Sequence, residues 1–273
     1  MNTNSNCYNL ADIKIPESVV NIRHEAFYNT KWLENYTDDF VIVNGILYKY
    51  KGNQENIIIP DSVKNISNFA FENCCNIRNI IIPDSVVNIG IHAFADCKNL
   101  ERVTISGSIE YIERATFGNC ENLKSIELPE SITDIHDDAF NNCTNLTYLT
   151  ININKVKINL SDRGNMNIIK TMNNILSLVR NKDFSVRLDL RIKYKLIIDD
   201  FFVMGDNDTK YYIKKNFTKI MKQCIENNDI DRINKILKNT GFVTKRNINH
   251  FISYSAENNK YEIQNILLDY KNK

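Results

Sequence analysis

Glycine and proline are scarce in this sequence: the chain of 273 residues contains 8 glycines and 4 prolines. Such low counts exclude a collagen-like chain and a Gly/Pro-rich low-complexity chain. The turns must therefore use other residues, and asparagine, at roughly one residue in six or seven, is abundant enough to supply them. Apolar residues make up 43% and charged residues 25%, which is the composition of a folded globular protein.

Long apolar runs are also missing. The longest are only a few residues, far short of the roughly 20 that a membrane-spanning helix needs. The stretch from Met1 to Cys7 contains no basic residue and no apolar segment, so it does not resemble a secretory signal. We therefore expect a cytoplasmic protein that does not associate with a membrane.

The two halves of the chain differ in charge, although the whole carries a net charge of only +1. Residues 1–153 contain 11 basic and 20 acidic residues, whereas residues 154–273 contain 23 and 13. This asymmetry indicates two domains. The basic half leaves nucleic acid open as a partner of residues 168–273. We favour the alternatives, that the halves attract each other or that lysine is simply abundant, because no arginine-rich stripe interleaved with aromatic residues is evident.

A 23-residue period organises the first half. Pro60, Pro83, Ser106 and Pro129 open four similar stretches, each displaced from the one before by the same 23-residue step. The same step aligns three columns of equivalent residues: Phe71, Phe94, Phe117 and Phe140; Cys74, Cys97, Cys120 and Cys143; Ile77, Leu100, Leu123 and Leu146. Several columns in register indicate a solenoid, in which each coil stacks on the next and buries the apolar side that it cannot bury alone.

Each coil is expected to contribute one short strand to a parallel sheet. In the stretch Leu100–Ile105, apolar residues occupy the first, fourth and sixth positions, so they point inward while the residues between them point outward. An earlier copy of the repeat begins at Pro16, and Asn44-Gly45 follows it between two apolar runs. Asn-Gly is a strong signal for a tight turn, so we expect a β-hairpin insertion near residues 40–50 in place of one coil.

The stretch Ile82–Leu100 carries the pattern Ile-Pro-Asp-Ser-Val-x-x-Ile-x-x-x-Ala-Phe-x-x-Cys-x-x-Leu, and similar stretches begin at Ile59 and Leu128. This pattern resembles the BspA-type (Treponema pallidum-type) leucine-rich repeat. The resemblance, over about residues 11–152, implies a curved solenoid used for recognition, and many members of the family are secreted adhesins. In one coil Ser106-Gly107 replaces Pro-Asp and Thr116 replaces alanine, so we expect that coil to pack differently.

The 23-residue period is lost after residue 153. Residues 154–167 are expected to form a last capping strand and a linker. From residue 168 the apolar spacing becomes helical. Cys224–Asn228 resembles Ser255–Asn259 at a 31-residue offset, which suits a repeated helix pair similar to ankyrin repeats. A plain helical bundle is the alternative.

The predicted fold is therefore of the α+β repeat class. A leucine-rich repeat solenoid with a parallel sheet occupies residues 1–153, and a small all-α, ankyrin-like domain occupies residues 168–273.

Reactive side chains do not form a recognisable catalytic or metal site. The column cysteines recur once per 23-residue period and cannot converge on one ion, so we interpret them as buried, reduced side chains. No nucleophile-elbow, P-loop or dinucleotide-binding motif occurs. The first three histidines (His24, His92 and His136) fall at different offsets from the phenylalanine column, and the paired carboxylates Asp137-Asp138 and Asp199-Asp200 are expected to cap or solvate a surface. We expect no enzymatic activity, no metal and no cofactor.

The outward strand residues carry the binding hypothesis. The charges of one column, Arg78, Glu101 and Lys124, alternate at the spacing of neighbouring strands, either as an ordinary charge ladder or as part of a binding surface. Exposed isoleucine and tyrosine beside arginine is a composition typical of interface cores. The predicted partner-binding residues, with both isoleucines and the tyrosine as anchors, are Ile58, Arg78, Asn79, Ile81, Glu101, Arg102, Thr104, Lys124, Ser125, Glu127 and Tyr148.

We therefore predict a protein–protein interaction or scaffold module that recognises another protein through the concave face of the sheet. A preformed surface of this kind loses little entropy on binding. Two alternatives stay open: a cell-surface adhesin exported without a recognisable signal, and binding of an anionic ligand such as nucleic acid through the basic half.

Overall fold

The computed structural model describes residues 7–153, 156–161 and 168–273. The chain divides into two compact units, the first comprising Met1–Ile153 with Lys157–Asn173 and the second comprising Asn154–Val156 with Asn174–Lys273. The predicted linker over 154–167 lies outside the described residues, except for one strand at Val156–Ser161.

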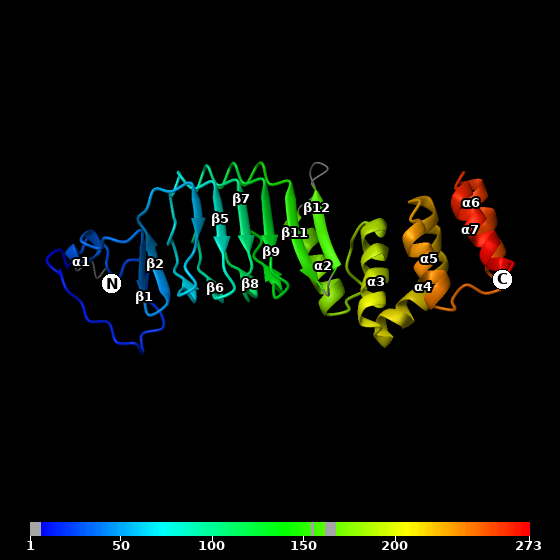
Figure 1. Cartoon of the computed structure of the whole chain (residues 1–273), viewed down its shortest axis with the longest axis horizontal. Coiled ribbons are helices and arrows are strands. Elements are labelled where there is room, and N and C mark those ends of the chain that lie inside the picture. Colours follow the sequence, from blue (N-terminus) through cyan, green and yellow to red (C-terminus); the bar gives the residue numbers. More distant parts are fainter. Residues whose placement is uncertain (1–6, 154–155, 162–167) are drawn as a thin grey trace. The chain divides into compact units, whose positions relative to one another are not determined.

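The first unit is a parallel β-solenoid (Figure 1). Its long strands form a six-stranded sheet in the order β12-β11-β9-β7-β5-β3, while the other strands form a four-stranded sheet, β1-β2-β4-β6, and a two-stranded sheet, β10-β8. Neighbouring long strands pair at the 23-residue offset, as Ile80 does with Val103, so the predicted coil is confirmed. The elements are α1 (Lys31–Glu34), β1 (Phe40–Val43), β2 (Ile46–Tyr50), β3 (Asn56–Ile58), β4 (Asn65–Ile66), β5 (Asn79–Ile82), β6 (Asn88–Ile89), β7 (Arg102–Ile105), β8 (Tyr111–Ile112), β9 (Ser125–Leu128), β10 (Asp134–Ile135), β11 (Tyr148–Ile153) and β12 (Val156–Ser161).

The phenylalanine column forms the centre of the solenoid core. Phe71, Phe94 and Phe117 are fully buried, and the ring centroids of successive column members from Phe71 to Phe140 lie 4.8 to 5.3 Å apart. Tyr50 of β2 extends the stack, with its ring centroid 5.1 Å from that of Phe71. Because each ring occupies the same inward position of its coil, every coil buries its apolar side against its neighbours.

The cysteine column ties each coil to the one before it. Burial raises the pKa of the Cys74 thiol to about 11 and also raises the pKa of Cys97, so these thiols stay protonated at neutral pH. Three column thiols donate to the carbonyl oxygen of the phenylalanine 26 residues earlier, at 3.0–3.2 Å, in the pairs Cys97–Phe71, Cys120–Phe94 and Cys143–Phe117. The column is therefore a set of internal hydrogen-bond donors.

Asparagine takes the place of glycine in the turns. Asn73, Asn119 and Asn142 adopt positive φ angles of 62°, 58° and 60°, and Asp96 adopts 59° at the equivalent position. Asparagine and aspartate tolerate this left-handed region because their short side chains form local hydrogen bonds. The Asn142 amide, for example, donates to Oδ1 of Asn119 at 2.8 Å. The scarcity of glycine thus has a structural explanation.

The coil that departs from the repeat pattern has compensating contacts. The Ser106 N–H donates to the Ile82 carbonyl oxygen at 2.9 Å, a bond that the prolines of the other coils cannot make. A Cβ atom at Gly107 would lie 2.3 Å from a backbone carbonyl oxygen of the preceding coil, so glycine is required there. The buried Thr116 hydroxyl donates to the Glu113 carbonyl oxygen at 2.8 Å.

The hairpin expected near residues 40–50 is formed by β1 and β2, which pair antiparallel around Asn44-Gly45. Strand β2 also pairs in parallel with β4, with Ile46 opposite Asn65. It therefore occupies the short-strand position of a coil and adds nothing to the six-stranded sheet, in which β3 is the terminal strand. The Tyr48 hydroxyl explains this placement, because it donates to the His24 carbonyl oxygen of the N-terminal coil at 2.5 Å.

Helix α2 (Ile168–Arg180) closes the two-stranded sheet. Its Asn173 side chain accepts from the Ile135 N–H at 3.2 Å and donates to the Ile135 carbonyl oxygen at 2.8 Å. The amide thus replaces a neighbouring strand at the edge of β10, satisfying backbone groups that an open edge would leave unpaired.

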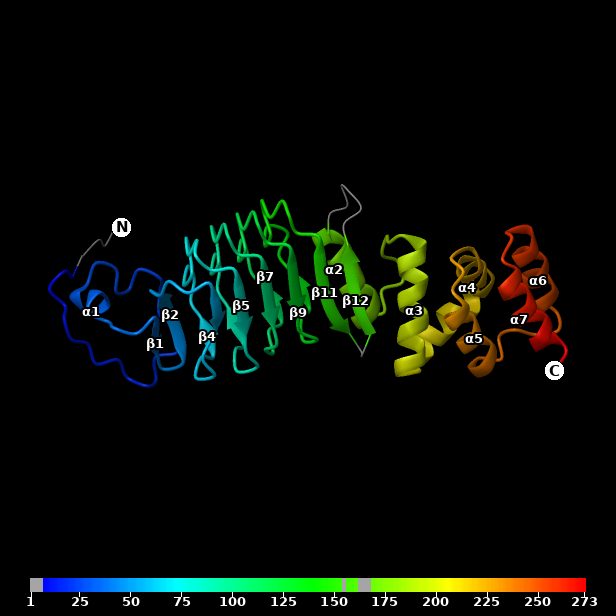
Figure 2. The same cartoon turned by 45° about the horizontal axis from the view of Figure 1, so that its top comes forward.

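The second unit is helical (Figure 2). Helix α4 contacts α5 and α6, while α7 contacts α5 and α6, which makes two stacked helix pairs of the kind that the ankyrin-like interpretation predicts. Asn228 and Asn259 are related by the same 31-residue offset and adopt positive φ angles of 56° and 58° in equivalent turns. The helices that follow α2 are α3 (Leu190–Met204), α4 (Asn207–Glu226), α5 (Ile230–Asn239), α6 (Ile248–Glu257) and α7 (Tyr261–Lys271).

Among the described residues, no helix combines the length and the apolar character that crossing a bilayer requires.

Candidate binding surface

The outward side chains of the six-stranded sheet form one surface, which we call the outer strip. Strand register places two rows across it: Asn79, Arg102, Ser125 and Tyr148 in one, and Ile58, Ile81, Thr104 and Glu127 in the other. A third row directly precedes β5, β7 and β9 and consists of Arg78, Glu101 and Lys124. All eleven residues of the binding hypothesis therefore lie together on this surface.

None of the outer-strip residues is buried. The exposed fractions of Ile58, Ile81 and Tyr148 are 69%, 43% and 55%, which is high for large apolar side chains. The residues between them along the strands, such as Ile57 and Ile80, are almost completely buried. The two-residue alternation of a strand thus produces a polar surface with a few apolar side chains in contact with solvent.

The charged row is a connected ion-pair network. Nη1 of Arg78 lies 3.0 Å from Oε1 of Glu101, and Nζ of Lys124 lies 2.6 Å from Oε2 of the same carboxylate. The hydrogen bond from Lys124, with a further contribution from Arg78, lowers the pKa of Glu101 below its ordinary value. Exposed ion pairs add little stability, but this network holds three long side chains in a defined arrangement.

We expect the Lys124→Met substitution to raise the pKa of Glu101 toward its ordinary value, because the largest cause of the lowered pKa is removed. The measurement is a ¹³C NMR titration of the glutamate side chains. The lowered pKa also means that the network stabilises the fold above the unfolded-state pKa and that this contribution is lost as the pH falls through the folded-state pKa. Lys98→Met, at an exposed position in a turn, is the control and should leave the Glu101 titration unchanged. An unchanged titration in Lys124→Met would contradict the network.

The apolar side chains of the strip form two separate points. Ile58 and Ile81 are directly opposite each other on β3 and β5. Tyr148 lies in the other row on β11, three strand spacings from β5, or about 14 Å at ~4.8 Å per spacing. The structure therefore brings the two isoleucines together and keeps the tyrosine apart.

Two residues of this surface were missed by the sequence analysis. The Asn79 amide donates to Oδ1 of Asn56 at 2.7 Å, and Nε of Arg78 lies 3.4 Å from Oε2 of Glu55. Each of the two lies one repeat period before its partner, so the period contained the signal. It was overlooked because the regular repeats become recognisable only at Pro60.

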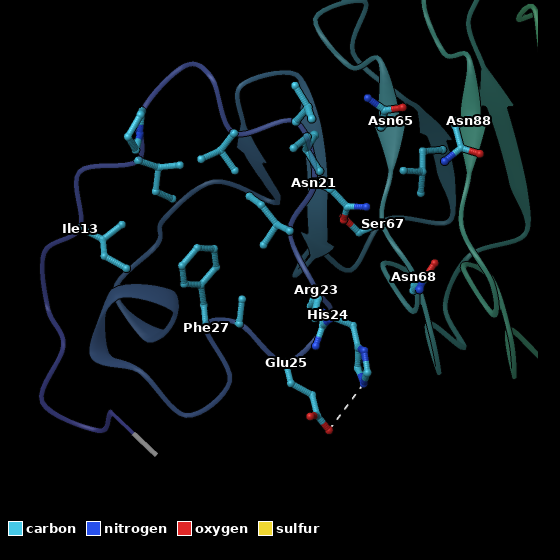
Figure 3. A pocket seen from close by; sticks show the side chains of 18 of the residues that line it. Ile13, Asn21, Arg23, His24, Glu25, Phe27, Asn65, Ser67, Asn68 and Asn88 are labelled. Carbon is cyan, nitrogen blue, oxygen red and sulfur yellow. Dashed lines mark ion pairs between the residues drawn. The ribbon is translucent and has the colours of Figure 1, made fainter. Parts of the chain in front are cut away.

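A second hollow lies between the N-terminal coil and the short strands (Figure 3). Its volume is about 1200 Å³, and its walls include residues from 13–27 together with Asn65 and Asn88 of neighbouring strands. At its rim, Nε2 of His24 lies 3.5 Å from Oε1 of Glu25. This groove is polar and distinct from the outer strip.

The histidines differ from the sequence-based expectation. The rings of His24 and His92 lie on either side of Phe69, with centroids 4.5 and 5.0 Å from it, so two of the first three histidines do belong to one row. The expectation failed because His92 is equivalent to Phe69 in the repeat, a column that the analysis did not consider. His136 lies elsewhere, with Nδ1 4.0 Å from Oδ2 of Asp138.

The Asp199-Asp200 pair was predicted to cap or solvate a surface, and this prediction was wrong. Asp200 is only 4% exposed and pairs with Lys182, while Oδ1 of Asp199 accepts from Nε of Arg232 at 2.9 Å. Both carboxylates are thus internal ion-pair partners of the second unit. Within the part of the chain that the structure describes, no group of three or more His, Cys, Asp or Glu side chains could hold a metal ion.

Comparison with known families identifies the repeats. The sequence model of the BspA type leucine rich repeat region matches residues 2–39 and 42–162, in 6 copies. The chain belongs to this family of leucine-rich repeat proteins, whose repeats commonly mediate protein–protein interaction or surface adhesion.

Several solved structures resemble part of the chain. A leucine rich cell surface protein from Faecalibacterium prausnitzii is 36% identical over 38% of this chain and 28% of its own, with a TM-score of 0.36. The pneumococcal vaccine antigen PcpA is 27% identical over 41% of this chain and 28% of its own, with a TM-score of 0.38. A leucine-rich repeat protein from T. pallidum is 24% identical over 38% of this chain and 62% of its own, with a TM-score of 0.30. The chain thus spans less than two thirds of each of these proteins, and no curated protein matched it.

Proposed function

We propose that this chain is a non-enzymatic module that binds another protein through the outer strip. One observation carries the proposal: in-register strands present exposed Ile58, Ile81 and Tyr148 beside polar side chains that interstrand bonds already hold in place. Because these side chains are ordered before binding, the entropy that association costs is reduced. Isolated apolar side chains surrounded by polar ones match the composition of interface centres with a polar rim.

The test is quantitative capture of proteins from an extract of the native cell. The strip variant carries Arg102→Glu and Tyr148→Ala, both at exposed positions of the outer strip. The matched control carries Glu110→Lys and Tyr111→Ala, which also reverse one charge and remove one exposed tyrosine, but in and next to the short strand β8. We expect the bound protein to fall about tenfold or more with the strip variant, as for loss of an interface hot spot, and to be retained by the control. Equal capture by the wild type and both variants would contradict the proposal.

We further propose that the chain works in the cytoplasm, with surface adhesion as the competing location. Its seven cysteines are free thiols, two of them exposed at Cys7 and Cys75, which suits a reducing compartment. Fractionation of the native cell tests this, and recovery of the protein from the outer surface would favour the adhesin instead.

A further inference from the structure

One face of α4 concentrates positive charge in the second unit. The helix buries Ile213, Phe217 and Ile220 on its inner side. The 3.6-residue period brings a tyrosine and a row of lysines to the opposite side. We call this set the lysine face; it comprises Tyr211, Lys214, Lys215, Lys219 and Lys222, of which all but Lys222 are exposed.

The lysine face is not neutralised by the protein itself. Among the described residues, none of its four lysines forms an ion pair, although Lys182, Arg232 and Lys235 of the same unit all do. Nζ of Lys222 instead lies 4.4 Å from the ring centroid of Tyr254 on α6. Such uncompensated charge creates a positive potential that attracts an anionic partner.

The neighbouring helix pair repeats this charge. The 31-residue offset relates Lys214, Lys215 and Lys219 to three further exposed basic or titratable residues just before and within α6: Lys245, Arg246 and His250. Because α4 and α6 are in contact, these side chains extend the lysine face across both helix pairs. A repeated cationic surface suits an extended polyanion better than a small anion.

An aromatic hollow lies at the N-terminal end of the face. The ring of Phe184 stacks on that of Tyr212 with centroids 4.3 Å apart. These rings, together with Tyr211, Lys215 and the amides of Asn181 and Asn216, line a hollow of about 540 Å³. Asp208 also lines it, at the start of α4. The exposed fraction of Tyr211 is 69%, so one flat aromatic surface is free to stack on a ligand.

We propose that the lysine face binds single-stranded nucleic acid without strong sequence preference. Lys215 and Lys219 are one helical turn apart, about 6 Å at 1.5 Å per residue, and would hold successive phosphates. A base would stack on Tyr211 at the hollow, where the asparagine amides can hydrogen-bond its edge. Single-strand binding sites combine the same two features, a cationic track for the backbone and aromatic platforms for the bases. An acidic protein would use the lysines but not the aromatic hollow.

The test measures binding of the full chain to a fluorescein-labelled oligothymidylate of 20 nucleotides by fluorescence anisotropy. If three lysines contact phosphates, the affinity should fall about 20-fold between 50 and 200 mM NaCl. The variant Lys214→Glu/Lys215→Glu/Lys219→Glu should bind about tenfold or more weakly at 50 mM NaCl. The control Lys238→Glu/Lys271→Glu/Lys273→Glu changes the net charge equally at exposed positions outside the face and should bind almost as the wild type does.

A second variant separates nucleic acid from an acidic protein. Tyr211→Ala should weaken oligothymidylate binding about fivefold or more, because a stacking platform is removed, and should leave binding of polyglutamate unchanged. Circular dichroism of every variant checks that the helices persist. Absence of oligothymidylate binding at 50 mM NaCl, equal losses in the two triple variants, or an unchanged affinity in Tyr211→Ala would each overturn the proposal.

Discussion

Replacing Phe94 with alanine is expected to lower the free energy of unfolding of the first unit by about 3–5 kcal/mol. The side chain is fully buried, and its ring stacks on those of Phe71 and Phe117 with centroids 4.8 and 5.3 Å away. Removing the ring leaves a cavity in the middle of the stack. Each coil contacts only its neighbours, so the substitution also weakens the interfaces on both sides of its coil.

Trp32 provides a selective measurement of this effect. It is the only tryptophan of the chain, and it packs in the first unit with its ring centroid 4.5 Å from that of Phe27. Urea unfolding followed by tryptophan fluorescence therefore reports on the solenoid alone. The control is Phe140→Ala at the end of the stack, where the ring has one stacked neighbour and is 8% exposed. The idea of a continuous stack fails if Phe94→Ala costs no more than this control.

The second large effect is expected for Arg232→Met, which should destabilise the second unit by about 3–5 kcal/mol. Arg232 of α5 bridges two carboxylates, with Nε 2.9 Å from Oδ1 of Asp199 and Nη1 2.7 Å from Oδ2 of Asp229. Burial opposes its charge, but the hydrogen bonds to both carboxylates outweigh burial and raise the pKa of Arg232. Without the guanidinium, two poorly solvated carboxylates face each other with no counterion.

Circular dichroism at 222 nm during urea unfolding measures this loss, because the second unit is helical. Lys235→Met is the matched control on the same helix: its ion pair with Asp231 is exposed, and its removal should cost less than about 1 kcal/mol. Adding Asp199→Leu to Arg232→Met should restore part of the stability, since an apolar replacement of a buried pair is often nearly neutral. Equal effects of Arg232→Met and Lys235→Met would show that the bridge is not important for stability.

The solenoid was predictable because its information is periodic. Equivalent residues recur every 23 positions, so the columns of Phe71 and Cys97, the coil length and the outward positions of the strands all follow from the spacing. Asn44-Gly45 likewise marked its turn through a local backbone preference. The ends of the period were harder to interpret, as the omission of Glu55 and Asn56 shows.

Features that depend on contacts between distant residues were not predictable from the pattern. The hairpin joins the short strands because the Tyr48 hydroxyl bonds to the N-terminal coil, which no local signal indicates. Asp199 and Asp200 read as surface residues because their partners, Arg232 and Lys182, lie 33 and 18 residues away. The lysine face emerged only when helix packing showed which side of α4 is buried and which of its lysines have no acidic neighbour.

The amino-acid sequence by itself therefore determined the repeating coil, its inward columns and the outward residues of its strands, because stacking of equal units turns a one-dimensional period directly into neighbours in space. Only the tertiary structure decided which charges are paired, where the hairpin attaches and which helix surface stays cationic. Those outcomes depend on which side chains from unrelated stretches meet, and the burial and electrostatic energy of such meetings exists only in the folded chain.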